Sequence, residues 1–194
     1  MSSPYKTASV YTLGCKVNFT ETSMIARKFQ EEGLSLVSID EFADIYVINT
    51  CSVTENANTK CDKLVKKIRA INPDAYTIIT GCYAQLKSKE LSKNKNINLI
   101  VGSDDKIDIP NIIKNKIEDS VITSKVEDIS SFKVSYSTGD RVRSFIKVQD
   151  GCNYNCTFCT IPLARGKSRS SRISEVIKLT NSIERQGFKE IVLS

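Results

Sequence analysis

The stretch DIYVINTC, residues 44–51, decides the fold. Its apolar residues are β-branched or aromatic, which is typical of a buried strand, and the stretch ends in a cysteine. Residues 54–71 follow as the clearest helix pattern, with one apolar stripe formed by Ala57, Cys61, Leu64, Val65, Ile68 and Ile71. Pro73 ends this helix, and residues 76–80 predict another strand. Strand, amphipathic helix and strand in this order predict a parallel β-α-β unit.

The same alternation continues on both sides of this unit. Further strands are expected at 11–13 and 97–101, and further helices at 20–32, 84–91 and 108–117. Gly33 directly follows the first of these helices in the C-cap position, and Pro110 lies in the first turn of the last one. Strands separated by amphipathic helices predict an α/β fold with a doubly wound parallel sheet.

A second unit is expected near the end of the sequence. Residues 119–140 interrupt the alternation with serines and scattered apolar residues, so we interpret them as a linker after a first domain at 1–118. Residues 141–194 then predict one more β-α-β unit, with strands at 144–148 and 189–193 and a helix at 173–186. A lone unit cannot bury both faces of its parallel strands, so this second domain is expected to be incomplete.

The composition of the chain limits the kinds of metal site that it can form. The chain has 194 residues, 40% of them hydrophobic, and it shows neither a secretory signal nor an apolar run of membrane length, which predicts a cytoplasmic protein without a membrane partner. It has seven cysteines and no histidine. Cytosolic thiols stay reduced, which disfavours disulfides. Without imidazole, a metal would be held by thiolates, as in an iron–sulfur cluster or a thiolate zinc site.

Three cysteines follow three predicted strands. Cys15, Cys51 and Cys82 each come directly after one strand, and the first and third are preceded by glycine. Because parallel strands end at one edge of the sheet, these thiols are expected to converge in a crevice where such folds bind ligands. The alternative is that they are small core residues. For Cys61, which lies on the apolar helix stripe, core packing is the prediction.

A second trio lies in DGCNYNCTFCTIP, residues 150–162. Cys152, Cys156 and Cys159 have the spacing Cys-x3-Cys-x2-Cys, and no fourth cysteine follows nearby. A four-iron cluster takes four protein ligands when it is fully coordinated by protein. Three thiolates therefore leave one iron open, and an open coordination position is typical of a reactive site.

The second trio resembles the signature of the radical S-adenosylmethionine superfamily. The resemblance implies a 4Fe-4S cluster at Cys152, Cys156 and Cys159, with S-adenosylmethionine at its open iron. It also implies that Phe158 lies against this cofactor, although an ordinary core aromatic is the alternative reading. Residues 141–194 would then be the first β-α-β unit of a truncated radical S-adenosylmethionine barrel.

The upstream stretches TLGCKVNFTET, VINTCSVTENA and ITGCYAQ resemble the three cysteine motifs of the methylthiotransferase family. The resemblance implies an N-terminal domain in which Cys15, Cys51 and Cys82 bind an auxiliary 4Fe-4S cluster whose open iron holds the transferred sulfur. The amino-acid sequences of these motifs are most similar to those of the branch acting on tRNA threonylcarbamoyladenosine. The implied reaction adds a methylthio group to C2 of that adenosine, next to the anticodon, by radical chemistry.

The implied partners are tRNA, an electron donor and a sulfur source, the last two without an assigned identity. Residues 141–172 carry seven Lys or Arg residues against one acid, which is compatible with a nucleic-acid partner or with a solvated basic loop. Contacts to tRNA phosphates are expected from Arg165, Lys167, Arg169 and Arg172. Alternative substrates are isopentenyladenosine in tRNA and a ribosomal protein, and a non-catalytic metal-binding RNA module is a further alternative. This fragment alone is expected to be inactive.

Overall fold

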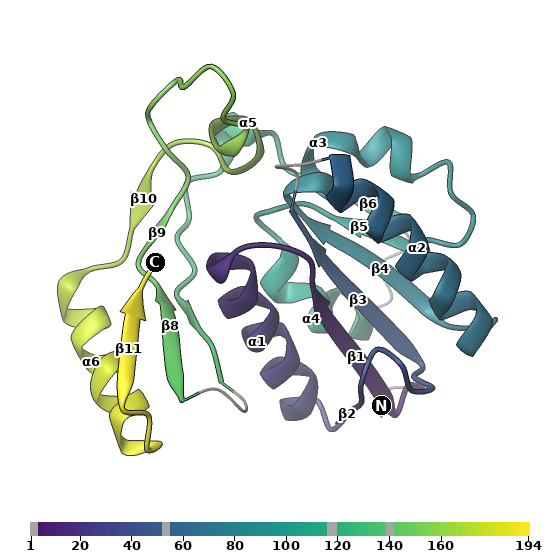
Figure 1. Ribbon diagram of the computed structural model, residues 1–194, viewed down its shortest axis with the longest axis horizontal. Coiled ribbons are helices and arrows are strands. Elements are labelled where there is room, and N and C mark those ends of the chain that lie inside the picture. The colour runs from purple at the N-terminus through teal and green to yellow at the C-terminus, as the bar shows by residue number, and fades with distance from the viewer. Residues whose placement is uncertain (1–3, 52–54, 116–119, 139–141) are drawn as a thin grey trace.

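A computed structural model describes residues 4–51, 55–115, 120–138 and 142–194, with only the backbone for residues 55–58. Its main sheet has six strands in the order β2-β1-β3-β4-β5-β6, and every neighbouring pair is parallel (Figure 1). The strands are β1 (Thr7–Thr12), β2 (Ser35–Leu36), β3 (Ile45–Thr50), β4 (Tyr76–Gly81), β5 (Leu99–Val101) and β6 (Val121–Ile122). The predicted α/β fold with a parallel sheet is confirmed.

Helices cover both faces of this sheet (Figure 1). Helices α1 (Lys16–Glu31) and α4 (Ile109–Lys114), with the short 3-10 helix η1 (Lys106–Asp108), lie on one face, and α2 (Glu55–Ile71) and α3 (Cys82–Leu91) lie on the other. Because successive side chains along a strand point to opposite faces of the sheet, each strand contributes to a hydrophobic core on either face. In register across three strands, Val47, Ile78 and Leu99 pack toward α1 and α4.

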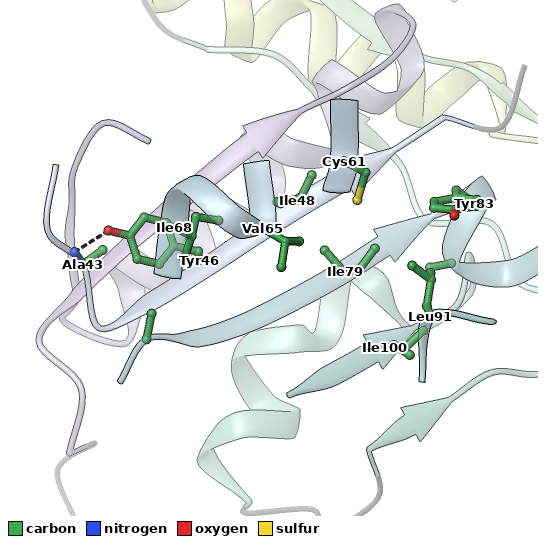
Figure 2. Packing of buried hydrophobic residues seen from close by; sticks show 12 residues of the cluster. Ala43, Tyr46, Ile48, Cys61, Val65, Ile68, Ile79, Tyr83, Leu91 and Ile100 are labelled. Carbon is green, nitrogen blue, oxygen red and sulfur yellow. Dashed lines mark hydrogen bonds between the residues drawn. The ribbon is translucent and has the colours of Figure 1, made fainter. Parts of the chain in front are cut away.

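The opposite core contains the predicted core cysteine. Ile48, Ile79 and Ile100, each one residue further along its strand, pack against α2 and α3. Figure 2 shows Cys61 among these side chains, close to Val65 of the same helix. Cys61 is fully buried, and burial raises the pKa of its thiol to about 12. Its predicted role in core packing is confirmed.

The second unit forms a smaller sheet beside α1. Strand β8 (Arg143–Lys147) pairs in parallel with β11 (Glu190–Leu193), and helix α6 (Ile173–Arg185) connects the two strands. This is the β-α-β unit expected from the sequence. The connection also holds a short antiparallel pair, β9 (Gln149–Asp150) with β10 (Arg169–Ser170), and the helix α5 (Ile161–Arg165).

The predicted linker is more ordered than expected. Strand β6 extends the main sheet, whereas β7 (Ser135–Tyr136) pairs antiparallel with β8, and the 3-10 helix η2 (Val126–Asp128) lies between them. Two-residue strands have no periodicity that a sequence pattern could show. Residue 119 and residues 139–141, where the linker was expected to begin and end, lie outside the described residues. The division into domains at these boundaries stays a prediction.

Helix α1 lies between the two sheets (Figure 1). Thr20 Oγ1 is 2.8 Å from Ser135 Oγ, and the Arg27 guanidinium lies 4.0 Å from the centre of the Tyr136 ring. Polar residues of this helix that would face water on a one-sided helix are therefore buried. None of the helices in the described ranges combines the length and apolar character that a membrane crossing requires.

Candidate functional site

The structure brings the three cysteines of the first unit to one pocket. Cys15 follows β1, Cys51 follows β3 and Cys82 begins α3 directly after β4, and these three strands are neighbours in the sheet. All three cysteines line a pocket of about 320 Å³. The pocket lies at the carboxyl ends of β1 and β3, where the strand order reverses and where open α/β sheets bind their ligands.

Two glycines allow the backbones to approach at this edge. A Cβ atom on Gly14 would lie 3.0 Å from the Cβ atom of Cys51. Gly81 has a φ of +95°, and a Cβ atom there would lie 2.3 Å from the carbonyl oxygen of Thr50. At Gly81 a side chain would collide with the backbone before Cys51, and at Gly14 it would press against Cys51, so both glycines permit the close approach of the loops that line the pocket.

Two helices begin at the pocket. The sequence pattern predicted helix starts at residues 20 and 84, but α1 begins at Lys16 and α3 begins at Cys82 itself. Cys15 therefore occupies the N-cap position of a 16-residue helix. The positive end of a helix dipole stabilises nearby negative charge, and thiolates benefit from it. Cys15 is exposed and Cys82 is buried, so the trio runs from the surface into the interior.

Asn18 connects the loops of the trio. Its side-chain oxygen lies 3.2 Å from Cys15 Sγ. Its amide nitrogen donates to the side-chain oxygen of Asn49 at 3.2 Å and to the carbonyl oxygen of Thr50 at 2.9 Å. Because Thr50 precedes Cys51, this one buried amide fixes the position of α1 relative to the end of β3.

Arg165, at the end of α5 in the second unit, reaches into this pocket. Its Nε–H donates to Cys82 Sγ at 3.2 Å, and one Nη2 hydrogen bond goes to the Asn18 side-chain oxygen at 3.1 Å. The remaining donors bind the carboxylates of Glu21, at 3.0 and 3.3 Å, and Asp150, at 2.9 Å. All five N–H donors of the guanidinium therefore have an acceptor.

A buried charge cluster surrounds this guanidinium. Glu21 is fully buried and also binds Lys106 Nζ at 2.7 Å and Lys147 Nζ at 3.2 Å. Burial alone would raise the pKa of Glu21, but the guanidinium and the two ammonium groups hold that pKa well below its ordinary value. Burial acts in the same direction on Asp150, whose pKa Arg165 and Lys147 nevertheless lower to about 2.

Sequence reasoning missed Asn18, Glu21 and Lys106 as members of this site. Asn18 and Glu21 lie in KVNFTETS, which is polar enough to suggest a solvent-facing turn of helix. Their burial depends on the second sheet, which covers α1 from the other side. The available signal was the position of Asn18 within the quoted motif LGCKVN, three residues after Cys15.

The donor set of the first trio fits an iron–sulfur cluster. The pocket lining includes three thiols, which are the donors that such clusters take, and a cationic guanidinium that offsets thiolate charge. In the described part of the chain, no group of three Cys, Asp or Glu residues is arranged so that it could hold a single metal ion. The three thiols therefore share a pocket without converging on a point where one ion could be bound.

The three cysteines of the second trio do not line one shared pocket. Cys156 and Cys159 line a pocket of about 390 Å³, whereas Cys152 lines another of about 590 Å³. Phe158, which lies between Cys156 and Cys159 in the sequence, has 97% of its surface exposed, so it is not a core aromatic. Its predicted contact with a cofactor stays a prediction, as do the ligand roles of these three cysteines.

The four residues predicted to contact phosphates fall into three cases. Arg165 is only 5% exposed and all its donors are used, so its predicted phosphate contact is wrong. Arg169 is largely buried and donates to the carbonyl oxygens of Ser131 and Lys167 at 3.0 and 2.6 Å, and its phosphate contact stays a prediction. Lys167 and Arg172 are exposed, and their phosphate contacts stay predictions.

Known proteins resemble nearly the whole chain. The profile of a family described as "Uncharacterized protein family UPF0004" matches residues 7–102. The threonylcarbamoyladenosine tRNA methylthiotransferase of Aquifex aeolicus is 38% identical over 94% of the chain, and that of Bacillus subtilis is 37% identical over 97%. The tRNA-2-methylthio-N(6)-dimethylallyladenosine synthase of Christiangramia forsetii is 33% identical over 95%.

The chain spans less than half the length of these relatives. The matched region covers 46% of the Aquifex protein, 43% of the Bacillus protein and 40% of the Christiangramia protein. The UPF0004 match lies within the six-stranded unit that carries Cys15, Cys51 and Cys82, and the relatives' matches extend across both units. Nearly the whole chain is therefore similar to part of these methylthiotransferases, and residues 7–102 match the UPF0004 family.

Proposed function

We propose that this chain is the part of a tRNA methylthiotransferase that holds an auxiliary 4Fe-4S cluster and begins the radical S-adenosylmethionine domain. The observation that carries the proposal is the shared pocket of Cys15, Cys51 and Cys82 at the ligand-binding edge of the sheet. We assign residues 1–118 to the domain that holds the auxiliary cluster, and residues 141–194 to the start of the radical S-adenosylmethionine domain. The setting that we propose is the cytoplasm.

Two iron–sulfur clusters and S-adenosylmethionine would supply the sulfur, the methyl group and the radical chemistry that adds a methylthio group to an adenosine. The cysteines of this chain would hold those clusters, Cys15, Cys51 and Cys82 one of them and Cys152, Cys156 and Cys159 the other. Asn18 and Arg165 would orient the first trio, because both hydrogen-bond to its thiols. Val17 and Ile161 add apolar surface to the pocket and would limit the access of water.

The tRNA substrate is proposed from the relatives and from two exposed cations. Lys167 and Arg172 would contact phosphates, which fixes the position of a nucleic acid without reading its bases. We favour threonylcarbamoyladenosine as the modified base, because the two methylthiotransferases named for it are 37% and 38% identical, against 33% for the dimethylallyladenosine enzyme. An electron donor and a sulfur source complete the proposed partners.

Anaerobic reconstitution tests the cluster assignment. The full-length protein should bind about eight irons per chain, and replacing either cysteine trio by alanine should remove about half of them. Bound zinc without charge-transfer absorbance would instead indicate a metal-binding module and would refute the proposal.

Mass spectrometry of tRNA nucleosides tests the substrate. A strain that lacks the full-length protein should lose the methylthio derivative of threonylcarbamoyladenosine and keep that of isopentenyladenosine. Loss of the isopentenyladenosine derivative alone would assign the other tRNA branch. Unchanged tRNA together with an unmodified ribosomal protein would assign a protein substrate.

A further inference from the structure

Arg165 belongs to a different unit from the cysteine that it contacts. It ends α5, in the connection between β8 and α6, whereas Cys82 begins α3 of the main sheet unit. The Nε–Sγ distance of 3.2 Å is a hydrogen-bond distance for sulfur, and both side chains are buried. The only cysteine of the first trio that is buried is thus contacted by a cation supplied by the second unit.

The charged groups around Arg165 have an excess of positive charge. The cations Lys106, Lys147, Arg165 and Arg169 share two carboxylates, those of Glu21 and Asp150. This cluster therefore carries two more positive charges than negative charges. Unbalanced buried charge is costly, so a negatively charged group beside Cys82 would be stabilised there.

The guanidinium is held rigidly in this position. Two carboxylates and the Asn18 side chain accept four of its five N–H groups, which leaves Nε–H directed at Cys82 Sγ. Hydrogen bonds to cluster sulfurs and nearby positive charge are among the factors that set the reduction potential of an iron–sulfur cluster.

We propose that Arg165 is a positioning residue of the auxiliary site, which hydrogen-bonds the Cys82 sulfur and raises the reduction potential of a cluster held there. This inference rests on the proposed function, because it requires a cluster at Cys15, Cys51 and Cys82. It gives the second unit a direct part in the site of the first. Glu21 acts one step further away, since it holds the guanidinium.

The test uses the full chain with Cys152, Cys156 and Cys159 replaced by alanine, so that all bound iron reports on the first trio. Arg165→Met removes the charge and the hydrogen bond, and Arg165→Lys keeps the charge but lacks the planar fork. Arg169→Met is the matched control, because Arg169 lies 3.8 Å from Asp150 in the same cluster and donates to the carbonyl oxygens of Arg165 and Lys167 instead of to Cys82. Circular dichroism checks that each variant folds.

The midpoint potential is then measured by redox titration followed by electron paramagnetic resonance. We expect Arg165→Met to shift the potential to more negative values, Arg165→Lys to shift it less in the same direction, and Arg169→Met to leave it nearly unchanged. If Arg165→Met does not fold, the midpoint potential of Arg165→Lys tests the inference. An unchanged potential in the Arg165 variants that fold would overturn the inference. Failure of the parent chain to bind iron would instead refute the proposed function.

Discussion

Replacing Glu21 by glutamine should destabilise the protein strongly. Glu21 is fully buried and is the shared acceptor of Lys106, Lys147 and Arg165. Glutamine has nearly the same shape but no charge, so Lys106 would lose its carboxylate partner and Lys147 and Arg165 would be left with Asp150. Removing one member of a buried ion pair costs about 3–5 kcal/mol. We expect a loss in this range in the free energy of unfolding at pH 7.

The matched control is Glu32→Gln. Glu32 pairs with Lys114 at 2.6 Å, but their side chains are 31% and 54% exposed, and such pairs contribute about 0–1 kcal/mol. Both variants are compared with the parent chain by urea unfolding followed by circular dichroism, and the midpoints give the differences. Equal effects of the two substitutions would refute the reasoning, since burial is what separates the two glutamates.

Acid should reduce the effect of Glu21→Gln. The pKa of Glu21 is lowered in the folded state, whereas in the unfolded chain it is about 4.3. The ionised carboxylate therefore contributes stability that is fully present above about pH 4.3 and is lost as the pH falls through the folded-state pKa. The difference between the parent chain and the variant should stay constant from pH 7 to about 5 and shrink at lower pH.

Three further predictions concern other parts of the chain. Gly81→Ala should cost more than about 2 kcal/mol of unfolding free energy, because its Cβ atom would lie 2.3 Å from a backbone oxygen, whereas Gly33→Ala, with an open surrounding, should cost only about 1 kcal/mol. Cys61→Ala should leave the iron content of the reconstituted chain unchanged and lower its stability by about 1 kcal/mol. Replacing Lys167 and Arg172 by alanine should weaken tRNA binding and lower its salt slope by about 1 per residue, measured by titration at several salt concentrations.

Much of the main sheet could be predicted from local patterns. The strands at 76–80 and 97–101 were predicted to within about two residues of β4 and β5, because buried parallel strands are continuous apolar runs. The first strand was predicted at 11–13, but β1 is Thr7–Thr12. Its sequence TASVYT mixes polar and apolar residues, so its place in the sheet follows from pairing with β3 and not from its own composition.

The pocket was predictable in outline, and its supporting residues were not. That Cys15, Cys51 and Cys82 share a pocket follows from the rule that parallel strands end at one edge. Arg165 could not be placed by the same rule, because its position depends on how the second unit packs on α1. A basic residue in a basic stretch was interpreted as a surface group, and only the tertiary contacts show it to be buried.

Ion pairs link the two units beside the pocket that we propose as the auxiliary site. Glu21 and Lys106 come from the main sheet unit, and Lys147, Asp150 and Arg165 come from the second. Because Glu21 of the main sheet unit pairs with Lys147 and Arg165 of the second unit, separating the units would expose a cluster whose carboxylates and cations depend on one another. The cysteines of the first trio could line a pocket without the second unit, but Cys82 would then lose its guanidinium donor. The sulfur chemistry that we propose for that pocket is therefore tied, through Arg165, to the docking of the unit that begins the radical domain.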